Sequence, residues 1–220
     1  PWDVYPRPTL KRDSYKCLNG KWDFRIKRGN KEIFKGDILV PFPVESRLSG
    51  VQKNIQKKDL MIYERYFEIE EDFYKKDNGQ KLILNFGAVD AETTVYVNNV
   101  SVCHNIGGYL PFSADISDYV KSGKNTLTVH VSDPLDSNVP YGKQRKKRGG
   151  MWYTPTSGIW QNVWLENVPD QYIESVKITS DLQGIELEVH ADKPDNVFVE
   201  ITLHTGEIVT KTYGAEEGNS

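Results

Sequence analysis

The sequence predicts an all-β protein, a β-sandwich followed by the start of a second one. Short stretches in which apolar and polar residues alternate recur along the 220 residues, and a period of two is typical of half-buried strands. Turn residues such as Gly, Pro, Asn and Asp separate these stretches. Nowhere do the apolar residues follow the spacing of an amphipathic helix.

The expected elements of the first half follow an irregular, proline-rich opening over residues 1–10. Strands are predicted at 21–28, 38–40, 61–70, 81–87, 93–98, 100–104 and 110–116. Pro41 and Pro43 cannot donate to a sheet, so 44–59 is expected to be loop, and either proline could follow a cis peptide bond. Asn98-Asn99 is a two-residue turn suited to positive φ and predicts a hairpin.

The second half begins with an expected single helical turn at 117–121, capped by Ser117 and ended near Gly123. Strands are then predicted at 125–133 and 162–168, with a long loop from Pro134 to Met151 between them. Loops of this length are commonly functional. Four further strands, at 172–179, 184–191, 196–204 and 207–213, follow in quick succession.

After Pro169 the predicted strands become closely spaced and are separated by short polar turns. This change predicts a domain boundary, giving domains 1–169 and 170–220. An immunoglobulin-like sandwich needs about seven strands in about 100 residues, and four would leave an inner face uncovered. We therefore expect the second domain to be incomplete and the natural protein to continue beyond Ser220.

Composition indicates a soluble globular chain with net charge −3 and a pI of about 5.9. This balance speaks against nucleic acid as a partner, although residues 143–148 form a basic run whose role stays open. No apolar run is long enough to span a bilayer, so no membrane is expected, and Cys17 and Cys103 are expected to be free thiols. The chain starts at Pro1, so a leader could have been removed; a cytoplasmic and a periplasmic or secreted bacterial location both stay open, as does the oligomeric state.

Residues 151–166 hold three of the five tryptophans, Trp152, Trp160 and Trp164, together with Tyr153. Such density anchors a core or lines a concave surface. The four histidines are not at ligand spacing, so we expect no metal site and no cofactor. Among the carboxylates Asp133 stands out, because it closes a strongly alternating strand and opens the long loop, where side chains leave the sheet for a rim. On local grounds it could equally be a residue that only initiates a turn before Pro134.

Many ordered motifs resemble those of glycoside hydrolase family 2, the family of β-galactosidases, β-glucuronidases and β-mannosidases. They lie within residues 18–22, 40–42, 63–65, 86–91, 95–99, 104, 107–112, 115–116, 123–127, 131–133 and 157–166. The resemblance covers roughly residues 5–168 and, more loosely, the strands to 213. It implies a jelly-roll (galactose-binding-domain-like) sugar-binding domain, then an immunoglobulin-like sandwich, here partial, and then a (β/α)8 barrel that carries two catalytic glutamates.

The barrel pattern is missing from this sequence, and so is the Asn-Glu pair that precedes one catalytic glutamate in the family. We therefore expect no catalytic residue here. The resemblance makes Asp133 the contact to the terminal sugar, with Arg65 and Gln144 as lesser candidates near the pocket. It makes Trp160 and Trp164 packing residues, and leaves Trp152 and Tyr153 to face the barrel.

The resemblance thus predicts the non-catalytic N-terminal portion of a retaining exo-β-glycosidase (EC 3.2.1.-), inactive alone, with a terminal β-linked sugar and the absent barrel as partners. One alternative is a stand-alone carbohydrate-binding module, which needs exposed, coplanar aromatic rings. A purely structural module is the other. The sequence does not fix which sugar is bound.

Overall fold

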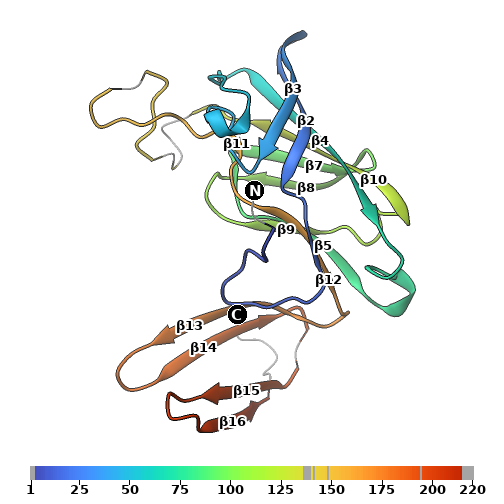
Figure 1. The fold of residues 1–220 in the computed structure, drawn as a ribbon, viewed down its shortest axis with the longest axis vertical. Coiled ribbons are helices and arrows are strands. Elements are labelled where there is room, and N and C mark those ends of the chain that lie inside the picture. The colour runs from blue at the N-terminus through green and yellow to red at the C-terminus, as the bar shows by residue number, and fades with distance from the viewer. Residues whose placement is uncertain (1–2, 136–139, 141, 148, 194, 215–220) are drawn as a thin grey trace. The chain divides into compact units, whose positions relative to one another are not determined.

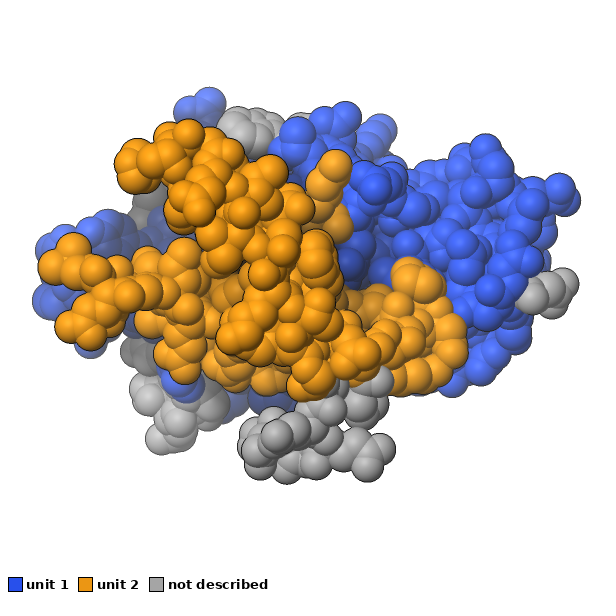
Figure 2. Space-filling model, turned by 90° about the horizontal axis from the view of Figure 1, so that it is seen from below, with its two compact units in different colours: residues 1–6, 12–168 blue, residues 7–11, 169–220 orange. Residues whose placement is uncertain are grey.

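The computed structural model describes residues 3–135, 140, 142–147, 149–193 and 195–214. The chain divides into two compact units, one formed by residues 1–6 and 12–168 and the other by residues 7–11 and 169–220 (Figure 2). The all-β prediction is confirmed, since the described helices are limited to two short 3₁₀ segments, η1 (Arg47–Ser49) and η2 (Lys76–Asn78). Within the described residues there is no helix of sufficient length and apolarity to span a bilayer.

The larger sheet of the first unit has six strands in the order β3-β2-β4-β10-β7-β8 (Figure 1). Their bounds are Gly20–Arg28 (β2), Lys31–Val40 (β3), Asp59–Ile69 (β4), Glu92–Val97 (β7), Val100–Ile106 (β8) and Gly123–Ser132 (β10). All neighbouring pairs are antiparallel. As the alternation predicts, Trp22, Phe24 and Ile26 are buried on one face of β2.

The smaller sheet has the order β1-β12-β5-β9. Its strands are Tyr15–Cys17 (β1), Lys81–Phe86 (β5), Phe112–Asp115 (β9) and Val163–Val168 (β12). Leu82, Leu84 and Leu165 from this sheet join the apolar face of the larger sheet in a single buried cluster, so the unit is a two-layer sandwich. A two-stranded ribbon, β6 (Val89–Asp90) with β11 (Gly158–Ile159), completes the unit.

Three local expectations have clear outcomes. Asn98 and Asn99 turn the β7–β8 hairpin at φ values of 50° and 69°, as predicted. The peptide bond before Pro41 is cis. The helical turn at 117–121 is wrong: the segment is a hydrogen-bonded turn in which the Tyr119 N–H donates to the Ile116 carbonyl at 2.9 Å. The Asp115 carboxylate stabilises the start of this turn by accepting the Ser117 N–H at 2.9 Å.

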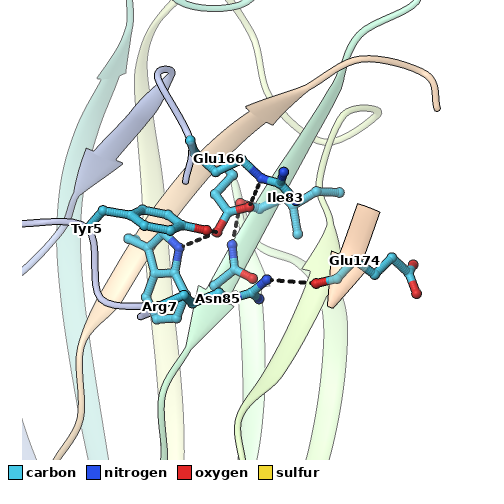
Figure 3. Close-up of polar contacts among 8 residues, drawn as sticks. Tyr5, Arg7, Ile83, Asn85, Glu166 and Glu174 are labelled. Atoms are coloured by element: carbon cyan, nitrogen blue, oxygen red, sulfur yellow. Dashed lines mark hydrogen bonds and ion pairs between the residues drawn. The ribbon is translucent and has the colours of Figure 1, made fainter. Parts of the chain in front are cut away.

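A buried carboxylate ties the N-terminal segment to the outer face of the smaller sheet (Figure 3). Glu166, on β12, is 2% exposed and accepts hydrogen bonds from Tyr5 Oη at 2.8 Å, Trp164 Nε1 at 2.7 Å and Arg12 Nε at 3.0 Å. Buried charges need such partners. Trp164 therefore packs within the unit, as the sequence predicts.

The second unit consists of two antiparallel hairpins. The first pairs β13 (Ile173–Ser180) with β14 (Ile185–Ala191), and the second pairs β15 (Val197–Thr202) with β16 (Ile208–Tyr213). The four predicted strands are thus present. None of the described residues from 169 onward is buried, so this unit has no core of its own in the described chain.

Candidate functional site

Three carboxyl side chains gather around Ser157 in the first unit. Asp133 follows the last residue of β10, Glu45 lies in the loop before η1, and Asp90 ends β6. Ser157 directly precedes β11. Residues separated by more than 100 positions in the sequence therefore meet at one end of the sandwich.

Backbone hydrogen bonds bring these segments together. Gly158 pairs with Asp90 in the ribbon of β6 and β11. The Val44 N–H donates to the Ser157 carbonyl at 3.2 Å, and the Ala91 N–H donates to the Ser132 carbonyl at 3.3 Å. Because each carboxyl lies within one residue of such a bond, its position is fixed by the fold and not by its side chain alone.

Ser157 is the hub of the cluster. Its Oγ lies 2.7 Å from Glu45 Oε1 and 2.6 Å from Asp133 Oδ2. Its backbone N–H donates to Glu45 Oε2 at 3.1 Å, and the Leu135 N–H donates to Asp133 Oδ1 at 2.9 Å. The sequence predicts Asp133 on a rim, but the structure buries it to 2% exposure, because Ser157 and the start of the long loop close over it.

Burial changes the acidity of this cluster. Loss of solvent raises the pKa of Glu45 to about 7, and the charge of Asp133 adds to the shift. Burial likewise raises the pKa of Asp90 to about 7, with contributions from the charges of Asp133 and Glu45. Tyr63, fully buried on β4, has a raised pKa for the same reason, and its Oη accepts the Ile159 N–H at 3.3 Å. Glu45 and Asp90 are therefore partly protonated near pH 7.

The loop after β8 approaches Asp90 very closely. A Cβ atom added to Gly108 would lie 2.5 Å from Asp90 Cγ, so only glycine fits there. Trp160 Nε1 donates to the Gly108 carbonyl at 2.7 Å, and its ring meets that of Tyr109 edge-on at 6.1 Å. Trp160 is half-buried and holds this loop in place, which agrees with the packing role predicted for it.

Gln144 lies beside the cluster. Its Nε2 donates to Tyr109 Oη at 3.0 Å, and its Oε1 accepts the Thr156 N–H at 2.6 Å. Burial, and to a smaller extent the charge of Asp90, raises the pKa of Tyr109. The structure thus brings Gln144 near Asp133 through Thr156 and Tyr109.

Trp152 lies at the end of the long loop and is half-buried. The Arg145 guanidinium lies 4.0 Å from the centroid of its ring, so one face of the ring is covered. Tyr153 is 69% exposed, and its backbone pairs with the segment at Lys143–Arg145. The two aromatic side chains of this loop therefore differ in exposure, and one face of the Trp152 ring is already occupied.

Arg65 is not brought to the cluster. It lies on β4 opposite Leu127, five residues along the strand from Leu60, which pairs with Ser132. Five strand residues span about 17 Å. The Arg65 Nη1 donates to the carbonyls of Asn19 at 3.2 Å and Lys21 at 3.3 Å, so it ties β4 to the start of β2.

A polar hollow of about 620 Å³ opens beside Glu45. Its lining is Glu45, Arg47, Gln52, Asn54, Lys146 and Thr154. Lys146 is the member of the basic run that reaches this hollow, and its Nζ lies 3.4 Å from Gln56 Oε1. Among the described residues, no group of three or more His, Cys, Asp or Glu side chains is arranged to hold a metal ion.

Glu45, Asp90 and Ser157 are members of the site that the sequence does not predict. Glu45 stands in a proline-flanked loop, and Asp90 stands in a motif that carried the family resemblance without a role of its own. Local patterns cannot show that these residues meet, because their contacts join distant segments. The one local signal was the density of turn residues around Ser157.

Residues 39–169 match the family model described as "Glycosyl hydrolases family 2, sugar binding domain". A putative β-glucuronidase of Formosa agariphila is 32% identical over 115 residues, covering 49% of this chain and 13% of that protein. A β-galactosidase of Thermoanaerobacter pseudethanolicus is 31% identical over 167 residues, covering 74% of this chain and 21% of that protein. The dog β-glucuronidase is 24% identical over 97% of this chain and 38% of its own length.

The fold is that of a β-glucuronidase from Ruminococcus gnavus, solved in complex with C6-substituted uronic isofagomine. The TM-score is 0.72 at 21% identity, covering 97% of this chain and 40% of that one. This chain spans well under half the length of the relatives it matches. On the match over residues 39–169, it belongs to glycoside hydrolase family 2 and carries the family's sugar-binding domain.

Proposed function

We propose that this chain is the non-catalytic, sugar-binding part of a retaining exo-β-glycosidase that removes a terminal β-linked sugar. The observation that carries this proposal is the buried carboxyl cluster around Asp133, within a sugar-binding domain of a hydrolase family. Relatives described as β-glucuronidases and β-galactosidases define the two sugars to test first.

The cluster itself is not the hydrolytic pair. A retaining glycosidase places two carboxyls about 5–5.5 Å apart on either side of the scissile bond. Glu45 and Asp133 instead bond the same Ser157 Oγ, which leaves no space for a sugar ring between them. We therefore place the nucleophile and the acid–base residue in a barrel outside this chain, and we expect the chain alone to be inactive.

Asp133 would supply a hydrogen-bonding anchor for the sugar. Each carboxylate oxygen accepts two hydrogen bonds, and the Leu135 N–H and Ser157 Oγ occupy one position on each Asp133 oxygen. The remaining positions would accept sugar hydroxyls only once the cover over this 2% exposed carboxylate opens. Gln144 and Trp152 would border the same wall, while the position of Arg65 favours a structural role.

The first test is the Asp133→Ala variant of the full-length enzyme, assayed on aryl β-glucuronides and β-galactosides. Losing a hydrogen bond to a charged group costs about 1–3 kcal/mol, so kcat/KM should fall by about 5- to 150-fold on the better substrate. Glu92 is an exposed carboxylate at the start of β7, and Glu92→Ala is the matched control. An unchanged kcat/KM in the folded Asp133→Ala enzyme would remove Asp133 from the sugar site.

The isolated 220 residues provide a second test. We expect no hydrolysis of either glycoside by this chain. Hydrolysis by the chain alone would contradict the non-catalytic assignment. A stand-alone carbohydrate-binding module remains less well supported, because Trp152 is covered by Arg145 and Trp160 meets Tyr109 edge-on at 72°.

A further inference from the structure

The two short side-chain contacts of Ser157 require one more proton than its hydroxyl carries. Its Oγ is within hydrogen-bond distance of both Glu45 Oε1 and Asp133 Oδ2, at 2.7 and 2.6 Å. A serine hydroxyl has one proton to donate and can otherwise only accept. If both carboxyls were ionised, one of these short contacts would set an oxygen lone pair against a carboxylate. One of the two acids must therefore be protonated and donate to Oγ.

Glu45 is suited to be the protonated partner. Its Oε2 accepts the Ser157 N–H at 3.1 Å, which leaves Oε1 to carry the hydroxyl that points at Oγ. Burial is the main cause that raises its pKa from an ordinary 4.5 to about 7. Asp133 has the same arrangement, since its Oδ1 accepts the Leu135 N–H and its Oδ2 lies against Ser157 Oγ. The geometry of Ser157 therefore requires one proton between the two acids, and the raised pKa assigns it to Glu45.

We propose that Glu45 is a positioning residue that keeps its proton and donates a hydrogen bond to Ser157 Oγ. The serine hydroxyl is thereby left to donate its own hydrogen bond to Asp133. This inference rests on the proposed function insofar as Asp133 meets the sugar. The relay fixes the Asp133 carboxylate in one orientation and leaves it as the ionised end of the chain. The arrangement is Glu45 acid, Ser157 hydroxyl, Asp133 carboxylate.

Several charged or titratable groups face Glu45 from the elements around it. Asp133 approaches from the end of β10, Asp90 from β6 and the Tyr63 phenol from β4. Arg47 and Lys146 line the hollow beside it. The two carboxyls oppose ionisation of Glu45, whereas the two cations lie on the solvent side and do not reach Ser157 through any hydrogen bond of the described residues.

The sign of the pH dependence follows from this proton. Between pH 4.5 and about 7 the folded chain keeps the Glu45 proton, whereas an unfolded chain has released it. Stability contributed by Glu45 is thus full below pH 4.5 and is lost as the pH rises towards and through 7. Above that range two carboxylates compete for one hydroxyl proton, and Asp133 loses its fixed orientation.

The decisive variant is Glu45→Gln, because an amide reproduces the neutral acid with one donor and one acceptor. We would follow urea unfolding of the 220-residue chain by tryptophan fluorescence at several pH values. Relative to Glu45→Gln, the wild-type unfolding constant should rise by up to about tenfold per pH unit through the window, since one proton is at stake. Glu32→Gln, an exposed carboxyl on β3, is the matched control and should follow the wild type.

Infrared spectroscopy reads the proton directly. The wild-type chain at pH 6 should show the carbonyl band of a protonated carboxylic acid, and Glu45→Gln should lose its share of that band while Asp90 keeps its own. Two results would overturn the proposal. One is an unchanged acid band in Glu45→Gln, and the other is a pH slope of stability that is the same in both proteins.

Activity of the full-length enzyme gives an independent readout. Glu45→Ala should lower kcat/KM about tenfold or more, the scale of one lost hydrogen bond to a charged group. Glu45→Gln should recover most of the lost kcat/KM. It should also remove the part of the fall in kcat/KM at alkaline pH that ionisation of Glu45 causes. If infrared and stability results hold but the full-length protein hydrolyses no glycoside, the shared proton stands and the proposed function fails. Equal loss in both variants would contradict positioning through a proton.

Discussion

Gly158 shows how closely the site is built at the scale of single residues. Its φ is +84°, a region that side chains rarely adopt, and an added Cβ would lie 1.9 Å from Tyr63 Oη. Tyr63 is itself buried and accepts the next backbone N–H, so it has no room to retreat. The glycine therefore lets β11 pass over the phenol and delivers Ser157 to the carboxyls.

The Gly158→Ala substitution should consequently be costly. Positive φ alone costs about 1–2 kcal/mol for a residue with a Cβ, and the clash with Tyr63 adds to that. We expect a loss of at least about 3 kcal/mol in the free energy of unfolding, which marks severe strain. Urea denaturation measures it.

Gly29→Ala is the matched control for this substitution. Gly29 also has positive φ, at +57°, but nothing lies within 4 Å of an added Cβ. It should lose only the backbone cost of about 1–2 kcal/mol. Equal losses in the two variants would mean that Tyr63 does not restrict the turn at Gly158.

At the scale of elements, prediction succeeded where burial alternates. The strands β2 and β10 bury every second residue, and such a pattern is visible without any knowledge of the fold. The strand β3 was predicted only for residues 38–40, whereas it extends over Lys31–Val40. Its first seven residues are exposed or half-buried at the edge of the sheet, so backbone pairing with β2 forms the strand without leaving a hydrophobic pattern.

The site was less predictable than the strands for a related reason. Asp133 was identified because it ends a clear strand and matches a family motif. Glu45 and Asp90 acquire their properties from neighbours that are 112 and 68 positions away in the sequence, at Ser157 and Gly158. Burial and shared hydrogen bonds of this kind exist only after the chain has folded.

The uneven burial of β3 gives a test within one strand. Ile38 is 1% exposed in the core, whereas Ile33 is 43% exposed on the edge. Ile38→Ala should lower the free energy of unfolding by about 2–5 kcal/mol, because it removes buried methyl groups and leaves a cavity. Ile33→Ala should stay within about 1 kcal/mol. A comparable loss at both positions would show that Ile33 is packed as tightly as Ile38 in solution.

At the scale of the whole molecule, the two units differ in how they are stabilised. The first has a continuous core that combines residues of both sheets, among them Trp22, Tyr63 and Phe86. The second has hairpins whose large apolar side chains remain exposed, including Phe198 at 64%, Ile208 at 57% and Ile178 at 55%. Backbone pairing alone gives a two-stranded hairpin only marginal stability in water.

Hydrogen exchange should separate the units. Amides of β4 and β10 are in the centre of the six-stranded sheet and should exchange only through global unfolding, whereas those of β13 to β16 should exchange by local opening. We expect protection factors in the hairpins of the 220-residue chain to be lower by about two orders of magnitude or more, a difference of about 3 kcal/mol in opening free energy. Mass-spectrometric exchange at neutral pH measures both sets of peptides in one experiment. Equal protection in the two units would mean that the exposed apolar side chains of the hairpins are covered in solution, for instance by a second copy of the chain, and dilution would then restore fast exchange.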